Sequence, residues 1–216
     1  MGAARAADVM GHTPGSTNEF GGALEVDDGT AARTETPPPG PIGLDAPSGG
    51  GANAAGVADR ILGYARKQRG SRIGDGECYT FADTALTTAG ARSAKDYGTV
   101  NKQADYVWGS SVSLSDLQPG DVIQMRDYRY DREVDVNNPD GSGSTKADFQ
   151  ERPHHTVIVE SVDGNGAVTV LEQNAPKGSA VRRSQLFFSD STTTDGNRKT
   201  TIKVKGSFWF YRPQAK

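Results

Sequence analysis

The single cysteine, Cys78, is the strongest nucleophile among the side chains of this chain. It directly follows Gly74-Asp75-Gly76-Glu77 and begins a stretch in which apolar residues recur at helical spacing. The free N–H groups and peptide dipoles at a helix N-terminus favour a thiolate, which is the nucleophile of cysteine enzymes. The alternative is a small buried core residue, a common role for an unpaired cysteine. Position alone leaves both interpretations open.

A histidine with polar neighbours lies in a predicted β-hairpin. Apolar alternation on both sides of Asp163-Gly164-Asn165-Gly166 is a strong hairpin signal. A two-residue turn there places His155 on one face with Glu172 and Asn174. If Gly164-Asn165 forms the turn, His155 lies opposite Asn174 and diagonal to Glu172. If Asp163-Gly164 forms it, Glu172 lies directly opposite.

Such a neighbour gives His155 a chemical role. A carboxylate or amide on one imidazole nitrogen fixes the tautomer, and the other nitrogen can then accept a thiol proton. His154 and His155 are adjacent, so in a strand they point to opposite faces and do not share a metal ion. The sequence has no Cys/His cluster with zinc spacing, because His12 lies far away near the N-terminus, and we expect no metal or other cofactor.

Two helices are expected to position the cysteine. Apolar residues at helical spacing predict the first over 54–69, ending before Gly70, and the second from near Glu77 to Gly90. The expected core residues of these helices are Val57, Ile61, Leu62, Ala65, Phe81, Ala82, Ala85, Leu86 and Ala89.

Strands follow the helices. The predicted strands are 122–125, 155–162, 167–174, 200–205 and 207–211. Residues 126–152 are highly charged and contain Asn137-Asn138-Pro139-Asp140-Gly141, so we expect a long loop beside the site. Helices followed by antiparallel strands indicate an α+β domain.

The N-terminal part of the chain differs in composition from the rest. Residues 1–53 carry seven acidic residues against Arg5 and Arg33, and they are rich in Gly and Pro. We expect this leader to be disordered, since it cannot bury enough apolar surface to offset chain entropy. The leader has a net charge of −5, and residues 54–216 have +2 of the total −3. We therefore expect one domain of 163 residues over 54–216, long enough to form a core.

Several classes of protein are excluded. No apolar run is long enough to span a membrane, and the N-terminus lacks the layout of a secretory signal. One cysteine cannot form an intrachain disulfide. The near-neutral domain has no basic stripe for nucleic acid. We expect a monomer that is cytoplasmic or exported by a non-classical route.

Four motifs carry a resemblance to a known family. In order, they are Gly76-Glu77-Cys78, Leu117-Gln118-Pro119-Gly120-Asp121-Val122-Ile123, His155-Thr156-Val157-Ile158-Val159-Glu160 and Val170-Leu171-Glu172-Gln173-Asn174. Together they resemble the cysteine, histidine-dependent amidohydrolase/peptidase (CHAP) domains of the NlpC-type papain-like superfamily, over about residues 61–213. The resemblance implies a papain-like α+β fold and cleavage of amide bonds, most often in bacterial peptidoglycan.

The same resemblance assigns roles to residues. Cys78 matches the nucleophile, His155 the general base, Glu172 the acidic residue that orients the imidazole, and Asn174 the amide two residues later. The sister NlpC pattern has its third polar residue at the position of Ala167, which cannot orient a histidine, so the CHAP pattern fits better.

Two features depart from the pattern or stay open. Some family members bind calcium before the cysteine, but this chain has only Asp75 there, so a metal is not expected. The candidates to contact substrate are Glu77, Tyr79, Trp108 and His154. Tyr79 and Trp108, like Trp209, are alternatively core side chains.

The sequence leaves more than one function open. The favoured hypothesis is a thiol amidase or endopeptidase that cleaves peptidoglycan or a peptide. A second is an exported effector that deamidates or cleaves a protein target, with an export machine or an immunity protein as partner. A third is a papain-like binding module without activity. In a fourth, the leader and the charged segment 126–152 are the working parts of an interaction protein.

Overall fold

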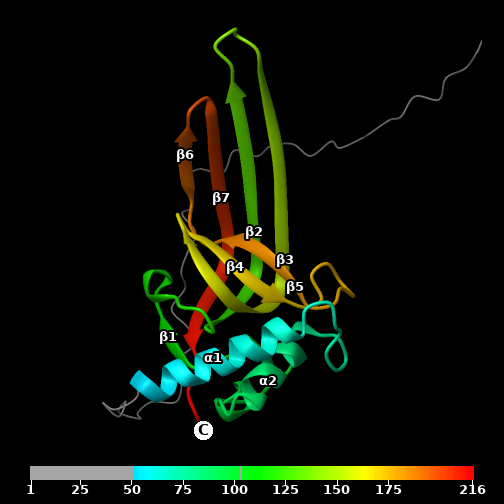
Figure 1. The fold of residues 1–216 in the computed structure, drawn as a ribbon. Coiled ribbons are helices and arrows are strands. Elements are labelled where there is room, and N and C mark those ends of the chain that lie inside the picture. Colours follow the sequence, from blue (N-terminus) through cyan, green and yellow to red (C-terminus); the bar gives the residue numbers. More distant parts are fainter. Residues whose placement is uncertain (1–50, 103) are drawn as a thin grey trace, which may run out of the picture. The chain divides into compact units, whose positions relative to one another are not determined.

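The computed structural model describes residues 51–102 and 104–216 of the chain. Two α-helices come first and are followed by strands that join a seven-stranded antiparallel sheet, as the α+β prediction requires (Figure 1). None of the helices described is both long and apolar enough to cross a membrane. The predicted leader lies outside the described residues, apart from residues 51–53, which belong to the first helix.

The helices pack against each other and against one face of the sheet. The first, α1 (Gly51–Lys67), begins three residues earlier than predicted, and the second, α2 (Cys78–Thr88), begins one residue after Glu77. Each buries the apolar stripe that the sequence predicts. The buried side chains are Val57, Ile61, Leu62 and Ala65 in α1 and Phe81, Ala82, Ala85 and Leu86 in α2.

The sheet has the spatial order β1-β7-β2-β3-β4-β5, and β6 pairs with β7. The strands are β1 (Ser110–Val112), β2 (Val122–Asn137), β3 (Gly143–Gly164), β4 (Ala167–Glu172), β5 (Arg182–Phe187), β6 (Ser191–Asp195) and β7 (Arg198–Arg212). Short 3-10 helices occur at Ala94–Asp96 and Leu114–Asp116. Strands β1, β5 and β6 were not predicted.

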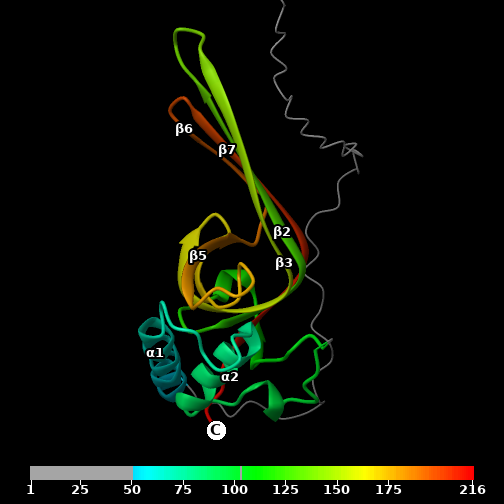
Figure 2. The same ribbon diagram turned by 90° about the vertical axis from the view of Figure 1, so that its right-hand side faces the viewer.

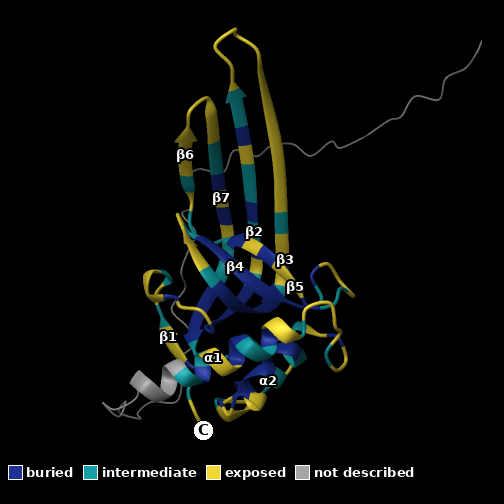
Figure 3. Ribbon diagram, viewed as in Figure 1, coloured by how far each residue is buried: buried dark blue, intermediate teal, exposed yellow. Residues whose placement is uncertain are grey.

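Both faces of the central strands are buried, by two different apolar clusters (Figure 3). Alternate residues of β2, β3 and β4 face the helices, for example Val122, Ile158 and Leu171. Their neighbours Ile123, Val157 and Val170 face the second cluster, around which β3, β4 and β5 curve (Figure 2). Because apolar side chains pack against both faces of the central strands, the side chains at the ends of these strands are held in fixed positions.

The prediction of a loop over 126–152 is wrong. This segment forms most of a long hairpin of β2 and β3, which turns at residues 138–142. Its charges lie on paired strands and not in a loop: Arg132 lies opposite Asp148, and Arg129 opposite Glu151. Beside this hairpin lie β6 and the first half of β7. We call the outer part of the sheet the arm, which consists of residues 129–137, 143–151, 191–195 and 198–205 (Figure 1).

The predicted break between two C-terminal strands is also wrong, because β7 is continuous through Gly206. Opposite this glycine, β2 has an irregular register between Arg126 and Arg129, and Asp127 has a φ of 50°. A Cβ at Gly206 would collide with the backbone of Asp127, and Gly206 itself has a φ of 99°. The glycine therefore accommodates a bulge in the neighbouring strand and does not end its own.

The predicted hairpin of β3 and β4 is confirmed, but both predicted turn positions are wrong. Gly164 pairs with Ala167, so Asn165-Gly166 forms the turn, with positive φ at both residues. Two register shifts follow, and Val159 then pairs with Val170. Near the site the register is that of the first alternative, with Glu172 diagonal to His155. Odd positions of β3 still share a face with even positions of β4.

Candidate active site

Cys78 is the first residue of α2, at the end of a tight loop. Gly76 takes a φ of 89°, and the carboxylate of Asp75 accepts a 3.0 Å hydrogen bond from the N–H of Glu77. Glu77 is the N-cap residue and has an extended backbone, which turns the chain into the helix. Burial raises the pKa of the Cys78 thiol, whereas interactions with His155 and with the main chain of Thr156 and Tyr79 lower it, and the N-terminus of α2 likewise favours negative charge there.

His155 and Glu172 lie together behind the cysteine, both buried, with exposures of 4% and 0%. Nε2 of His155 donates to Oε2 of Glu172 at 3.1 Å, since an ionised carboxylate can only accept. The other ring nitrogen, Nδ1, is left for the hydrogen bond that joins His155 to Cys78. The structure therefore brings together three of the four predicted catalytic residues.

The protonation of this trio favours an ion pair. Burial alone would raise the pKa of the Cys78 thiol, but the hydrogen bond and charge of His155 outweigh it and lower the pKa. Burial alone would lower the pKa of His155, but Cys78 and Glu172 raise it to about 9. Opposite shifts in the two partners correspond to a thiolate beside an imidazolium.

The fourth predicted residue, Asn174, is placed differently. It follows the end of β4 with a φ of 68°, and its Nδ2 donates to Oε2 of Glu77 at 2.9 Å. Its Oδ1 accepts from the N–H of Gly178 at 2.6 Å. The structure thus joins Asn174 to the residue before the cysteine, and the predicted placement of Asn174 against the imidazole is not found.

Sequence reasoning missed two residues of the site. Gln173 is fully buried, and its side chain accepts from the N–H of Ile73 and donates to the carbonyl groups of Ile73 and Glu77. It therefore attaches the cysteine loop to the end of β4. Arg152, placed in a loop by the prediction, is nine-tenths buried and contacts both carboxylate oxygens of Glu172.

Of the predicted substrate contacts, Trp108 is a core residue. It is completely buried, and its Nε1 donates to Gln124 at 3.3 Å. Trp209 is likewise buried. Tyr79 is partly buried, and its ring centre lies 4.9 Å from that of Tyr106. Tyr79 and the exposed Glu77 remain beside Cys78, where a substrate could meet them.

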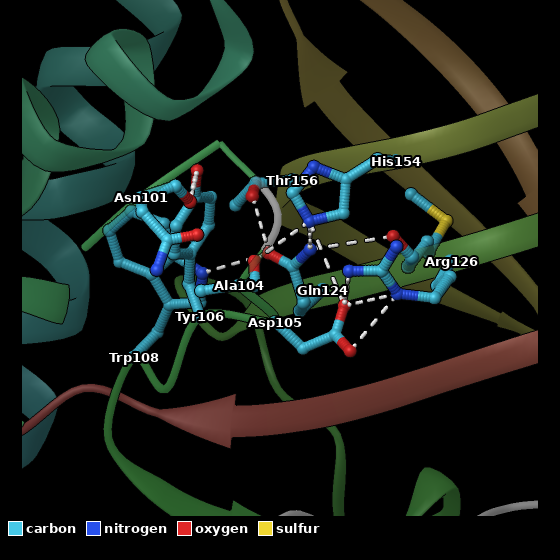
Figure 4. Close-up of polar contacts among 10 residues, drawn as sticks. Asn101, Ala104, Asp105, Tyr106, Trp108, Gln124, Arg126, His154 and Thr156 are labelled. Carbon is cyan, nitrogen blue, oxygen red and sulfur yellow. Dashed lines mark hydrogen bonds and ion pairs between the residues drawn. The ribbon is translucent and has the colours of Figure 1, made fainter. Parts of the chain in front are cut away.

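His154 contacts residues 104–106, which we call the wall segment (Figure 4). His154 and His155, predicted to point to opposite faces of the strand, have different partners: Nε2 of His154 lies 3.0 Å from the carbonyl oxygen of Ala104. Next to it, Asp105 forms an ion pair with Arg126 at 2.9 Å. Burial, followed by the positive charge of Arg126, lowers the pKa of His154. These contacts attach residues 104–106 to β2 and β3, so His154 has a positioning role there.

Within 51–102 and 104–216, no group of three or more His, Cys, Asp or Glu side chains is arranged to hold an ion. At the candidate site, the carboxylate of Glu172 is paired with His155 and with Arg152.

Comparison with known proteins gives one family. A family model described as AIM3/BBC1 Cysteine proteinase-fold domain matches residues 51–193, well over half of the chain. No curated protein matches the sequence. A solved structure titled "The crystal structure of Ly7917" has 23% sequence identity and a TM-score of 0.36, over 67% of this chain and 61% of that chain. The chain thus spans less than two thirds of that protein, and so low a TM-score carries no argument.

Proposed function

Because the chain belongs to the AIM3/BBC1 cysteine proteinase-fold domain family and joins Cys78 to His155, we propose that it is a thiol-dependent hydrolase of amide bonds. The family match supports the papain-like fold that the sequence predicts. The finer resemblance to CHAP domains rests on the four sequence motifs, and it supports bacterial peptidoglycan as the substrate.

The observation that carries the proposal is the placement of Cys78, at a helix N-terminus, beside the buried pair of His155 and Glu172. A core cysteine needs no charged partner, whereas the pKa of this thiol is lowered, against the effect of burial, by an imidazole that a carboxylate orients. Such an arrangement stabilises the reactive form of the thiol before any substrate binds.

The proposed reaction has two steps. The Cys78 thiolate attacks the amide carbonyl carbon, while the N–H of Cys78, among the first of α2 and without a carbonyl partner in a preceding turn, stabilises the oxyanion. The carbon–nitrogen bond breaks, and the proton on Nδ1 of His155 passes to the leaving amine. His155 then accepts a proton from water, which attacks the thioester and releases the acid and the Cys78 thiolate.

Location and partners follow from the proposed substrate. A peptidoglycan hydrolase acts outside the membrane that encloses its cytoplasm, so the proposal includes export. If the target belongs to a rival cell, an immunity protein would protect the producer. Glu77 and Tyr79, next to the nucleophile, are the proposed contacts for the peptide.

The test is digestion of purified peptidoglycan by the full chain, with soluble products read by mass spectrometry. Wild type should release fragments with new amine and carboxyl ends, and Cys78→Ala and His155→Ala should each lose at least about 1,000-fold in rate. Glu172→Ala should lose less than either. Equal activity of wild type and Cys78→Ala on any substrate would overturn the thiol mechanism. If peptidoglycan yields no product while Cys78 is reactive, protein amides replace peptidoglycan as the proposed substrate.

A further inference from the structure

Arg152 is a buried charge that the proposed reaction does not use. Its side chain is 10% exposed, and that of its partner Glu172 is fully buried. Resting on the proposed function, we propose that Arg152 is a positioning residue that balances the charge of the active site and so allows Cys78 to be held as a thiolate.

The geometry ties Arg152 directly to the proposed catalytic residues. Its Nη2 donates to Oε1 of Glu172 at 2.7 Å, and its Nε donates to Oε2 at 2.9 Å. Oε2 also accepts from His155. One carboxylate thus lies between a permanent cation and the imidazole, and a two-pronged contact of this kind fixes its plane as well as its position.

The guanidinium is itself held in place. Nη1 donates to the carbonyl oxygen of Glu151 at 2.8 Å, and Nη2 also donates to the side chain of Gln150 at 3.0 Å. A bulge in β2 lies across from this part of β3, and Arg152 and His155, three positions apart, both reach Glu172. Strict strand alternation would put them on opposite faces, but between them the pairing of β2 with β3 skips Asp127, whose φ is 50°, and Pro153.

A count of buried charges shows what Arg152 adds. With the thiolate and imidazolium formed, Cys78 and Glu172 are negative, and His155 and Arg152 are positive, so the group is neutral. Without Arg152 the same state has a net charge of −1 in a buried site, which burial disfavours. The favoured state would then keep the Glu172–His155 ion pair and return the proton to Cys78.

The other titratable groups around the cluster do not supply the missing charge. Tyr128 and Tyr130 of β2 face Arg152, and burial raises the pKa of both, so they are neutral. Tyr106, in the wall segment, faces Cys78 and is also kept neutral by burial, which raises its pKa. Glu77 is an exposed acid bonded to Asn174. Arg152 is therefore the cation that offsets Glu172.

The test uses the fact that the chain has one cysteine, so that alkylation by iodoacetamide reports Cys78 alone. The rate is measured against pH on the full chain. For Arg152→Met we expect the midpoint to rise by about one pH unit or more. For the double variant Arg152→Met/Glu172→Gln, which removes both charges, we expect it to return to within about half a pH unit of wild type.

Two further variants separate charge from other effects. Arg152→Lys keeps the charge without the two-pronged geometry, and we expect its midpoint to stay within about half a pH unit of wild type. Arg212→Met breaks another arginine pair with a buried carboxylate, that of Asp121, away from the site, and should leave the midpoint unchanged. Circular dichroism checks that each variant is folded.

An unchanged midpoint in folded Arg152→Met would overturn the proposal, as would a double variant shifted as far as the single one. If Arg152→Met does not fold, the lysine and double variants decide: upward shifts of about one unit in both would contradict charge balance. Alkylation needs no substrate, so these shifts without hydrolysis of either peptidoglycan or protein amides would reject the proposed function and leave the role of Arg152 standing.

Discussion

Strand β3 takes part in two arginine–carboxylate pairs of nearly equal length in opposite surroundings. In the arm, Arg132 Nη2 lies 2.6 Å from Asp148, with side chains 38% and 49% exposed. At the site, Arg152 Nη2 lies 2.7 Å from Glu172, with side chains 10% and 0% exposed. Water screens the first pair and is excluded from the second.

The difference teaches that contact geometry alone does not show what a charge pair does. Attraction between exposed charges is largely offset by hydration and by ordering of the side chains. A buried charge depends on its partner, because an unpaired ion in the interior is costly. The arm can carry many charges without linking them to chemistry, whereas at the site each charge alters the protonation of its neighbours.

Breaking the buried pair should have the largest effect on stability. We expect Arg152→Met to lower the free energy of unfolding by about 3–5 kcal/mol, because it leaves Glu172 with one partner in place of two. Urea titration followed by circular dichroism measures the loss. A loss below about 1 kcal/mol would mean that the pair is as weak as an exposed one.

The next largest loss of stability should come from acid, which protonates Glu172 in its pair with Arg152. Burial alone would raise the pKa of Glu172, but His155 and Arg152 lower it from 4.5 to about 2. The resulting stability is fully present above pH 4.5 and is lost as pH falls towards 2. We expect wild type to lose on the order of 3 kcal/mol more than Glu172→Gln over this range. If the free energies of unfolding of the two proteins fell in parallel over this pH range, the lowered pKa of Glu172 would be contradicted.

The link between the cysteine loop and β4 should have an intermediate effect. Gln173→Ala removes three partly buried hydrogen bonds to Ile73 and Glu77, and we expect the free energy of unfolding to fall by about 1–3 kcal/mol. Gln185→Ala, in which an exposed glutamine loses a bond to Asp163, is the matched control and should change little. Equal losses in the two variants, measured by urea titration, would show that Gln173 does not anchor the loop.

Breaking the exposed pair should have the smallest effect. For Arg132→Met we expect a change of at most about 1 kcal/mol, because both side chains are substantially solvated. The same urea titration compares it directly with Arg152→Met. If Arg132→Met cost as much as Arg152→Met, burial would not explain the contrast between the two regions.

The sequence predicted the elements that local patterns specify. Both helices, the strand at 122–125 and the β3–β4 hairpin follow from apolar spacing and turn residues close to one another in the chain. The shared face of His155 and Glu172 also follows, since two register shifts leave the alternation intact. These features depend on the alternation of side chains between the two faces of a strand and on turn residues close to one another in the chain.

The sequence could not predict features that depend on distant partners. The charges of 126–152 indicate a loop unless one knows that Arg132 will face Asp148 across a hairpin. Arg152 was missed for the same reason, since its burial depends on Glu172 and on an irregular strand. Asn174 was misplaced because β4 ends before it, and its backbone then turns towards Glu77. Apolar and aromatic residues at alternate positions, Tyr128, Tyr130, Val134 and Val136, were an available signal of a strand there.

The central claim is that His155 activates Cys78, and the pH dependence of alkylation in wild type and His155→Gln tests it most directly. The account predicts a wild-type midpoint well below 9.0, the usual pKa of a cysteine thiol, because the thiolate is paired with an imidazolium. In His155→Gln the midpoint should rise by at least about one pH unit, because burial is no longer opposed by that charge. Coincident profiles of the two proteins, both with the midpoint of an ordinary thiol, would contradict it.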